Sequence, residues 1–237
     1  RVVTPVARET KNPAPRQLHP STWGLLCPMD TPEGGACGLT KSLAIMAHVR
    51  VGTVAQPIVD CIDDLRRPPE SFALHPHLEA SSTARARGPP VFVNGVLLWY
   101  CEDDACAAEV SRVLRDRRRC ESIPFDTSIC FSDGCVHVNT DTGCLMRPLL
   151  CVEKLHELPG VLCAYEDPRD VVGILLRKGV LVYLDKREEM EYRVALDPKR
   201  EPVDGWASYT YCEIDPSLIV GLCGACIPFA DFNQSPR

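Results

Sequence analysis

A glycine-rich turn with flanking cations, in residues 15–43, is the part of this sequence best suited to hold a phosphate or a carboxylate. The segment contains Arg16, Lys41 and the turn Pro32–Gly35, and apolar residues at helical spacing follow the turn. This pattern predicts a helix that begins near Cys37, with backbone N–H groups and a positive helix end facing whatever lies opposite. The same pattern more often belongs to a turn that only reverses the chain.

The order of motifs at both ends of the chain gives this segment a more specific meaning. Residues 16–43 hold Arg-Gln-Leu-His, Trp-Gly, Cys-Pro, Thr-Pro-Glu-Gly and Ala-Cys-Gly-Leu, and residues 212–237 hold Cys-Glu-Ile-Asp-Pro-Ser, Ile-Pro-Phe and Asn-Gln-Ser-Pro-Arg. Both series resemble the second-largest (beta, Rpb2-like) subunit of multisubunit DNA-dependent RNA polymerases. Because the chain lacks a starting Met and ends inside a motif, we expect it to be an internal fragment of such a subunit.

The resemblance implies part of an enzyme, DNA-directed RNA polymerase, which adds nucleotides by two-metal phosphoryl transfer with Mg²⁺. It implies that the Mg²⁺ ligands lie mainly outside this fragment, in the largest subunit and beyond Arg237. The implied partners are the largest and other polymerase subunits, template DNA, the RNA–DNA hybrid and nucleoside triphosphates, with no membrane. The implied location is the nucleus or a viral transcription site within a host cell.

The resemblance also assigns roles to single residues. Arg237 matches the position that reaches the triphosphate of the incoming nucleotide, as catalytic residue, and the fixed fork of a guanidinium suits two phosphate oxygens. Residues matched to nucleic-acid contacts are Arg8, Arg16, Gln17, Asn233 and Gln234. Glu33 is expected to support the active centre by orienting Arg16 or another cation, because a carboxylate repels phosphate. No metal ligand is expected in the fragment.

Charge and composition set limits on the function. The chain is 45% apolar, enough for packed cores, and its net charge of −6 argues against a free-standing nucleic-acid binder. Residues 1–52 are the exception, since basic side chains outnumber acidic ones there. This first part is expected to face a polyanion. Within it, residues 1–14 are predicted to form an exposed loop, a fork loop beside the transcription bubble in the family, with a solvated connector as an equal alternative.

The fourteen cysteines are interpreted as buried thiols in a reducing intracellular compartment. Four of them, Cys101, Cys151, Cys163 and Cys223, lie inside apolar patterns. Cys223 and Cys226 form a single C-x-x-C, and no zinc is expected there because zinc needs four ligands. His75 and His77 are predicted to be surface loop residues. The sequence has no signal-type leader and no apolar run of transmembrane length.

The fold class is predicted to be α+β, a multi-subdomain fragment with mixed antiparallel sheets and short helices. The resemblance divides it into the end of a fork region (1–55, domain 3-like), an external domain (56–144, domain 4-like), a second external segment (145–205, domain 5-like) and the start of a hybrid-binding domain (206–237, domain 6-like). Trp23 is predicted to pack in the core beneath the glycine-rich turn.

Local patterns predict the elements of the central part. Asn94–Gly95 predicts a hairpin over 91–100, and Asp103 begins a helix that ends at Arg119. The four arginines near the end of that helix, Arg115 and Arg117–Arg119, are interpreted as solvated. The remaining expectations are a loose segment at 53–90, a meander over 128–153, a helix from Asp167–Pro168 to Gly179, strands at 180–184 and 191–196 with a charged turn between, and a helix from Asp215 to Gly224 with Leu218, Ile219 and Leu222 buried.

Two other classes of function stay open. One is a non-catalytic structural or protein-interaction fragment of a divergent polymerase subunit, which the acidic centre of the chain allows. The other is a thiol-based enzyme or metal protein, which the cysteine spacings disfavour. The sequence contains no Ser/His/Asp arrangement, P-loop or dinucleotide fingerprint.

Overall fold

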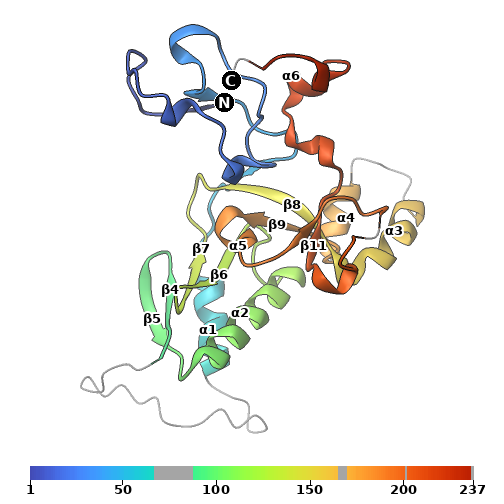
Figure 1. Cartoon of the computed structure of the whole chain (residues 1–237). Coiled ribbons are helices and arrows are strands. Elements are labelled where there is room, and N and C mark those ends of the chain that lie inside the picture. The colour runs from blue at the N-terminus through green and yellow to red at the C-terminus, as the bar shows by residue number, and fades with distance from the viewer. Residues whose placement is uncertain (67–87, 165–169, 201, 236–237) are drawn as a thin grey trace.

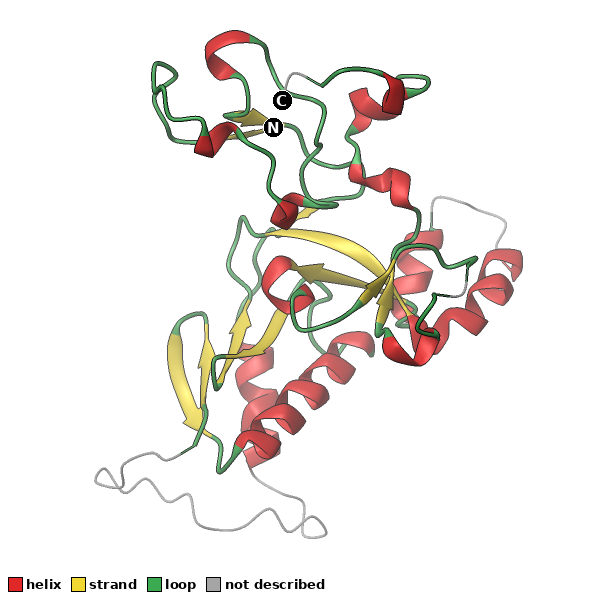
Figure 2. Cartoon of the chain, in the orientation of Figure 1, coloured by secondary structure: helices red, strands yellow, loops and turns green. Residues whose placement is uncertain are grey.

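The computed structural model describes residues 1–66, 88–164, 170–200 and 202–235, and the chain folds into three parts (Figure 1). The first and last segments of the chain lie side by side in one lobe, which we call the terminal lobe. A central sheet follows beneath it, and a second sheet with two helices forms the opposite end of the molecule (Figure 2). Each of the three parts therefore contains both helices and strands, which confirms the α+β class.

The terminal lobe contains little regular structure. Strand β1 (Val2–Val3) pairs antiparallel with β2 (Thr40–Lys41), and residues 1–14 are otherwise irregular. The other elements of the lobe are short turns of 3-10 helix at Ala14–Arg16, Pro20–Thr22, Gly34–Ala36, Pro216–Ile219 and Ala230–Phe232, and the helix α6 (Leu222–Ala225).

The helix predicted to begin near Cys37 is absent, and β2 follows the turn instead. Gly38 has a φ of +73°, and a Cβ there would lie 2.6 Å from the Cα of Arg16. The apolar residues at helical spacing do not form one helix face. Leu39 is buried, and Leu43 forms an isolated β-bridge with Leu26. The backbone at Gly38 therefore packs closely against the backbone at Arg16 where the helix was predicted.

The central sheet has five strands. Its order is β10 (Val194–Ala195), β11 (Tyr211–Cys212), β8 (Leu145–Cys151) and β3 (His48–Val49), and β9 (Leu181–Asp185) also pairs with β8. Helices α3 (Leu158–Ala164) and α4 (Val171–Arg177) pack on this sheet around Leu150, Val161 and Ile174. The buried strands β8 and β9 lie beneath the terminal lobe (Figure 1).

The second sheet has the order β5 (Val96–Tyr100), β4 (Pro90–Val93), β7 (Cys135–Asn139) and β6 (Ser128–Ser132). Helices α1 (Gln56–Arg66) and α2 (Asp104–Arg119) cover it, and their shared core contains Ile58, Ile62, Val110 and Leu114. Strands β4 and β7 are parallel, while the other neighbours are antiparallel. This sheet has a core separate from that of the central sheet.

Several local predictions are confirmed. Asn94 and Gly95 form the hairpin turn with φ of 49° and 78°. The Asp103 carboxylate accepts a hydrogen bond from the Cys106 N–H at 2.7 Å, so Asp103 caps α2 as predicted. Gly179 ends α4 with a φ of +65°. The predicted start of that helix at Asp167–Pro168, and His75 and His77, lie outside the described residues.

Other local predictions are wrong. The segment 53–90 was predicted to be loose, but it contains α1. The meander over 128–153 is only the hairpin of β6 and β7, because β8 leaves to join the central sheet. The charged turn after β9 is a short helix, α5 (Lys186–Glu189), and β10 is shorter than the strand predicted at 191–196.

The helix predicted from Asp215 to Gly224 is also interrupted. Val220 is extended, with a ψ of 154°, and its carbonyl accepts a hydrogen bond from the Ile45 N–H at 2.9 Å. Leu222, predicted to be buried, is 70% exposed. Pairing with the N-terminal segment therefore takes precedence over continuation of the helix.

Candidate nucleic-acid interface

Arg16 holds the two loops of the terminal lobe together. Its Nη1 donates hydrogen bonds to the carbonyl oxygens of Gly35 and Cys37 at 2.8 and 2.9 Å. Its Nη2 donates to the carbonyl oxygens of Arg8 and Thr10 at 2.8 and 3.3 Å. The guanidinium thus joins residues 8–10 to the glycine-rich turn.

This arrangement differs from one of the two alternatives expected for Glu33, that it orients Arg16 rather than another cation. Carbonyl oxygens orient the Arg16 guanidinium, and the Glu33 side chain is exposed on the turn. The side chains of Arg8 and Gln17 are exposed too. Both Nη atoms of Arg16 already donate hydrogen bonds within the chain. Of the two arginines, Arg8 therefore has the side chain that is more available to contact a phosphate.

The other side of the glycine-rich turn is held by a buried hydroxyl. Thr31 Oγ1 accepts a hydrogen bond from the Gly38 N–H at 2.9 Å and donates to the Thr40 carbonyl oxygen at 2.9 Å. The Asp30 N–H donates to the Cys27 sulfur at 3.3 Å. Residues 27–31 are therefore fixed against the start of β2.

Residues 29–31 form one wall of an open groove of about 430 Å³. The opposite walls come from α6 and from the last described residues of the chain. Its lining residues are Met29, Asp30, Thr31, Cys223, Gly224, Ile227, Asn233, Gln234 and Ser235. Ser235 Oγ donates to the Pro28 carbonyl oxygen at 3.4 Å, which ties this last segment to the first. The structure therefore brings Asn233 and Gln234 together in one groove.

The remaining predicted site residues are not part of this groove. Arg8, Arg16 and Gln17 lie in the loop that the Arg16 guanidinium fixes, and Glu33 projects from the turn. Arg237 lies outside the described residues.

A buried ion cluster connects the terminal lobe to the central sheet. Arg147, on β8, donates from Nε to Glu189 Oε2 at 2.8 Å and from Nη1 to Glu213 Oε1 at 2.5 Å. Trp23 Nε1 donates to the same Glu213 oxygen at 3.1 Å, and Lys186 Nζ donates to Glu189 Oε1 at 2.8 Å. Residues from the Trp-Gly and Cys-Glu-Ile motifs therefore meet at one guanidinium.

The charges in this cluster determine the ionisation of Glu189. Burial alone raises the pKa of its carboxyl group, but the hydrogen bonds and charges of Arg147 and Lys186 outweigh burial and lower the pKa below its ordinary value of 4.5. Glu189 is thus held as a carboxylate, which balances the buried Arg147 guanidinium.

Trp23 was predicted to lie in the core, and this prediction is wrong. Its side chain is 41% exposed, and its indole N–H reaches Glu213 at the edge of the ion cluster. The cluster itself was missed. A single arginine inside the apolar run Leu145–Cys151 was the available signal, because a charge on a buried strand needs partners.

A second ion cluster joins the two sheets. Arg118, at the end of α2, donates to both carboxylate oxygens of Glu188 at 2.8 and 2.6 Å and to the Thr127 carbonyl oxygen at 2.6 Å. Arg115 donates to Glu191 Oε2 at 2.6 Å. The arginines interpreted as a solvated helix end are therefore largely internal, and Arg118 is only 4% exposed.

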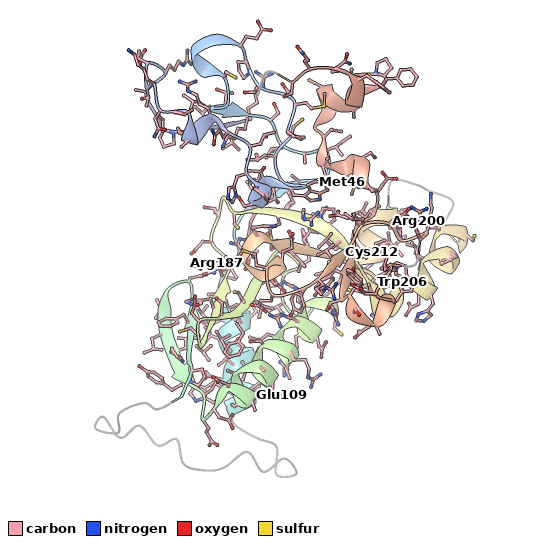
Figure 3. All side chains as sticks on the ribbon, viewed as in Figure 1. Met46, Glu109, Arg187, Arg200, Trp206 and Cys212 are labelled. Carbon is pink, nitrogen blue, oxygen red and sulfur yellow. The ribbon has the colours of Figure 1, made fainter. Side chains whose placement is uncertain are left out.

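The cysteines range from buried through partly buried to exposed. Cys101 and Cys151 are buried as predicted, and burial raises the pKa of the Cys101 thiol to about 12. Cys163 and Cys223 are exposed, contrary to prediction, as is Cys226. Figure 3 shows Cys212 among the packed side chains of the central sheet, where burial raises its pKa to about 12. Buried and exposed thiols therefore differ in the chemistry open to them.

Metal-binding clusters and membrane-spanning helices are both missing from the part of the chain that the structure describes. Across the ranges 1–66, 88–164, 170–200 and 202–235, no three or more His, Cys, Asp or Glu side chains form a group that could hold a metal ion. Within the same ranges, no helix has both the length and the apolar character needed to cross a membrane.

Comparison with known proteins relates this geometry to a family. Residues 1–49 match the family model described as RNA polymerase Rpb2, domain 3, and residues 91–153 match RNA polymerase Rpb2, domain 4. The chain belongs to the Rpb2 family of RNA polymerase subunits. The first match contains the loop and turn that Arg16 joins, and the second contains β8 with Arg147.

Individual relatives extend the match over the whole chain. The chain is 34% identical to the DNA-directed RNA polymerase II subunit RPB2 of Encephalitozoon cuniculi, over all of this chain and 21% of the relative. It is 33% identical to subunit 2 of RNA polymerase II from Arabidopsis thaliana, over all of this chain and 20% of the relative. It is 31% identical to subunit Rpo2 of Saccharolobus solfataricus, over all of this chain and 21% of the relative. The chain thus spans about a fifth of the length of these curated relatives.

Proposed function

We propose that this chain is part of the catalytic core of a DNA-directed RNA polymerase, within its second-largest subunit. It would contribute contacts to template DNA, the RNA–DNA hybrid and the incoming nucleoside triphosphate during DNA-templated RNA synthesis. The observation that carries this proposal is the groove in which Asn233 and Gln234 face Asp30 and Thr31. Residues far apart in the sequence, from the two end segments that carry the family resemblance, are neighbours there.

The proposed roles follow from the chemistry of each side chain. Amide groups such as those of Asn233 and Gln234 can donate to phosphate or sugar oxygens without adding charge. Exposed Arg8 and Gln17 would contact the nucleic-acid backbone, and Arg16 would position the loop that carries them. Arg237 is proposed, from the sequence alone, to hold the triphosphate.

The ligands that hold magnesium are proposed to lie elsewhere in the assembled enzyme. Among the described residues no cluster of acidic side chains fits a magnesium site. Bound magnesium would activate the RNA 3′ hydroxyl and neutralise the leaving pyrophosphate. The proposed partners are therefore the largest subunit, which would supply metal ligands, and the other polymerase subunits. A nuclear location, with a viral transcription site as the alternative, accompanies this proposal.

The four regions predicted from the sequence form the proposed domain division. Among the described residues, the buried side chains of the core around α1 and α2 come from positions between Ile58 and Val138, and those of the central-sheet cores come from positions between Leu149 and Cys212. This separation supports a boundary near residue 144. The meeting of both ends of the chain in the terminal lobe supports the pairing of the first part of the region 1–55 with the last part of the region 206–237, whereas β3 and β11 belong to the central sheet.

The groove can be tested by substitution in the full-length subunit within its assembled polymerase. Asn233→Ala and Gln234→Ala should each slow RNA elongation about tenfold, the effect of losing one hydrogen bond to a charged group. Gln56→Ala is the matched control, since Gln56 is an exposed amide on α1. Wild-type elongation by both groove variants would contradict the proposal.

The triphosphate contact needs a separate measurement. Arg237→Ala should raise the nucleotide KM and slow addition by roughly thirtyfold in total, corresponding to about 2 kcal/mol. Arg112 is the suitable control because its side chain is 62% exposed on α2, whereas Arg115 is held in the second ion cluster. Unchanged nucleotide kinetics in Arg237→Ala would remove that residue from the site.

A protein-interaction fragment is the second candidate, and strand β5 favours it. This edge strand exposes Val96, Leu97 and Tyr100 by 62%, 41% and 38%. An exposed apolar edge can pair with an extended segment of another protein. If Leu97→Lys abolished assembly with the other subunits while the groove variants had no effect on elongation, this candidate would replace the first.

A further inference from the structure

The C-x-x-C pair at α6 has a defined orientation that the sequence did not indicate. Gly221 and Gly224 face the interior: a Cβ on Gly221 would lie 2.7 Å from the Leu43 carbonyl oxygen and 3.2 Å from Cys27 Cβ, and one on Gly224 would lie 3.5 Å from the Cys27 sulfur. Each helical residue turns by about a hundred degrees, so Cys223 and Cys226 point away from these glycines. Both thiols are accordingly exposed.

The two cysteines also have a spacing from which a disulfide can form after a small movement of the backbone. Residues three apart on a helix have Cβ atoms about 5–6 Å apart, whereas a disulfide needs Cβ atoms about 3.5–4.5 Å apart, so the two Cβ atoms must approach each other by roughly 1–2 Å. Cys226 caps the end of α6, where its N–H donates to the Gly224 carbonyl oxygen. Ile227, which follows, is 43% exposed. Because Cys226 and Ile227 are exposed at the end of α6, we expect this end to make the small movement that brings the sulfurs into bonding distance.

One member of the pair, Cys223, lies at the groove that contains Asn233 and Gln234. Cys223 is one of the lining residues of this groove, together with Gly224. A metal site is disfavoured, because the part of the chain that the structure describes supplies no third His, Cys, Asp or Glu ligand for the pair. Thiol–disulfide exchange needs only the two sulfurs and an accessible small disulfide.

We propose that Cys223 and Cys226 form a reversible dithiol–disulfide site at the groove, oxidised by a low-molecular-weight disulfide. The thiolate of one cysteine attacks a sulfur of the small disulfide, forms a mixed disulfide and releases one small thiolate, which takes up the proton that the cysteine lost. The second cysteine, as its thiolate, then attacks the mixed disulfide and releases the second small thiolate, which takes up the proton that this second cysteine lost. The protein loses two electrons, the small disulfide gains them, and all atoms are conserved.

Mass spectrometry of the full-length protein in its native assembly tests this chemistry. After equilibration with oxidised and reduced glutathione, the peptide that contains both cysteines should lose the mass of two hydrogens and regain it with a dithiol reductant. In Cys226→Ser, Cys223 should instead carry a glutathione adduct, and Cys223→Ser should show the converse. Cys120 and Cys163, which are exposed and are controls for single thiols, should form adducts only.

Glutathione adducts on both cysteines of the wild-type protein, or no reaction at either one, would overturn the proposed site. A second arm, which rests on the proposed function, compares elongation rates of the oxidised and reduced enzyme. The elongation rate of the oxidised enzyme divided by that of the reduced enzyme should be several-fold below one in wild type. The same ratio should equal one in Cys223→Ser/Cys226→Ser. Disulfide formation with an unchanged ratio would support the site and overturn its link to the groove. Since the mass measurement does not need RNA synthesis, it stands even if the proposed function fails.

Discussion

Arg147 fills the space that any side chain at Gly24 would occupy. A Cβ on Gly24 would lie 2.7 Å from both Cδ and Nη1 of Arg147, and Gly24 has a φ of +67°. Two features therefore require a glycine in the Trp-Gly motif: the backbone conformation at this position and the guanidinium beneath it. The same guanidinium holds Glu213, so the two ends of the chain are positioned relative to each other by one buried side chain on β8.

Gly24→Ala should lower the free energy of unfolding by about 2–4 kcal/mol, the sum of a left-handed backbone penalty and overpacking against Arg147. Gly134→Ala is the matched control, since Gly134 has a φ of +70° and a Cβ added there would meet no atom within 4 Å. That variant should lose only about 1–2 kcal/mol. Denaturant unfolding measures both, and equal losses would show that Arg147 can move aside.

Arg118→Met should destabilise the protein by about 3–5 kcal/mol, because it leaves the Glu188 carboxylate buried and without its main partner. Both side chains are almost inaccessible, with exposed fractions of 2% and 0%. Arg112→Met removes the ion pair with Glu109, which lies on an exposed part of the same helix (Figure 3), and should cause no measurable loss. Similar losses in the two variants by thermal unfolding would contradict a special role of the buried pair.

Elements with local signals could be predicted from the sequence. The hairpin at Asn94–Gly95 and the cap at Asp103 depend on residues that are close in the chain, so short patterns determine them. Helix α1 also carries a local signal, since Ile58, Ile62 and Leu65 recur at helical spacing, but flanking prolines and charges obscured it. The sequence was therefore sufficient to predict an element where the residues that determine it lie within one or two turns of each other.

The candidate site depends on contacts that no local pattern contains. Arg118 and Glu188 are 70 residues apart, and Trp23 and Glu213 are 190 apart, so their charges and hydrogen bonds could not be paired from the sequence. Family resemblance pointed to Asn233 and Gln234, but only the fold places them in a groove with Asp30. The turn beside Gly38 was mistaken for a helix start because Leu39 is buried by tertiary contacts rather than by a helical face.

The pH dependence of stability should reflect Glu189. Its folded-state pKa is lowered, so its contribution is complete above the ordinary pKa of 4.5 and is lost as the pH falls through the folded value. Glu189→Gln removes this titration. The difference in unfolding free energy between wild type and Glu189→Gln should therefore be largest near neutral pH and shrink below pH 4.5. A difference that does not change with pH would mean that Arg147 and Lys186 do not hold Glu189 ionised.

Arg16 offers a test that separates a structural role from contact with nucleic acid. Arg16→Met removes the hydrogen bonds to the carbonyl oxygens of Arg8, Thr10, Gly35 and Cys37, so amide hydrogen exchange in the terminal lobe should become at least about tenfold faster. Arg8→Met is the control: its carbonyl oxygen still accepts from Arg16, and its own side chain is exposed. Exchange in Arg8→Met should therefore match wild type.

The same two variants should differ in nucleic-acid binding by the assembled polymerase. Loss of the proposed phosphate contact in Arg8→Met should reduce the slope of log affinity against log salt concentration by about one. Arg16→Met should weaken binding through disorder of the loop, with the change in exchange and the change in affinity appearing together. If Arg16→Met left hydrogen exchange unchanged but reduced the salt slope, Arg16 would itself contact a phosphate, and the carbonyl contacts would be secondary.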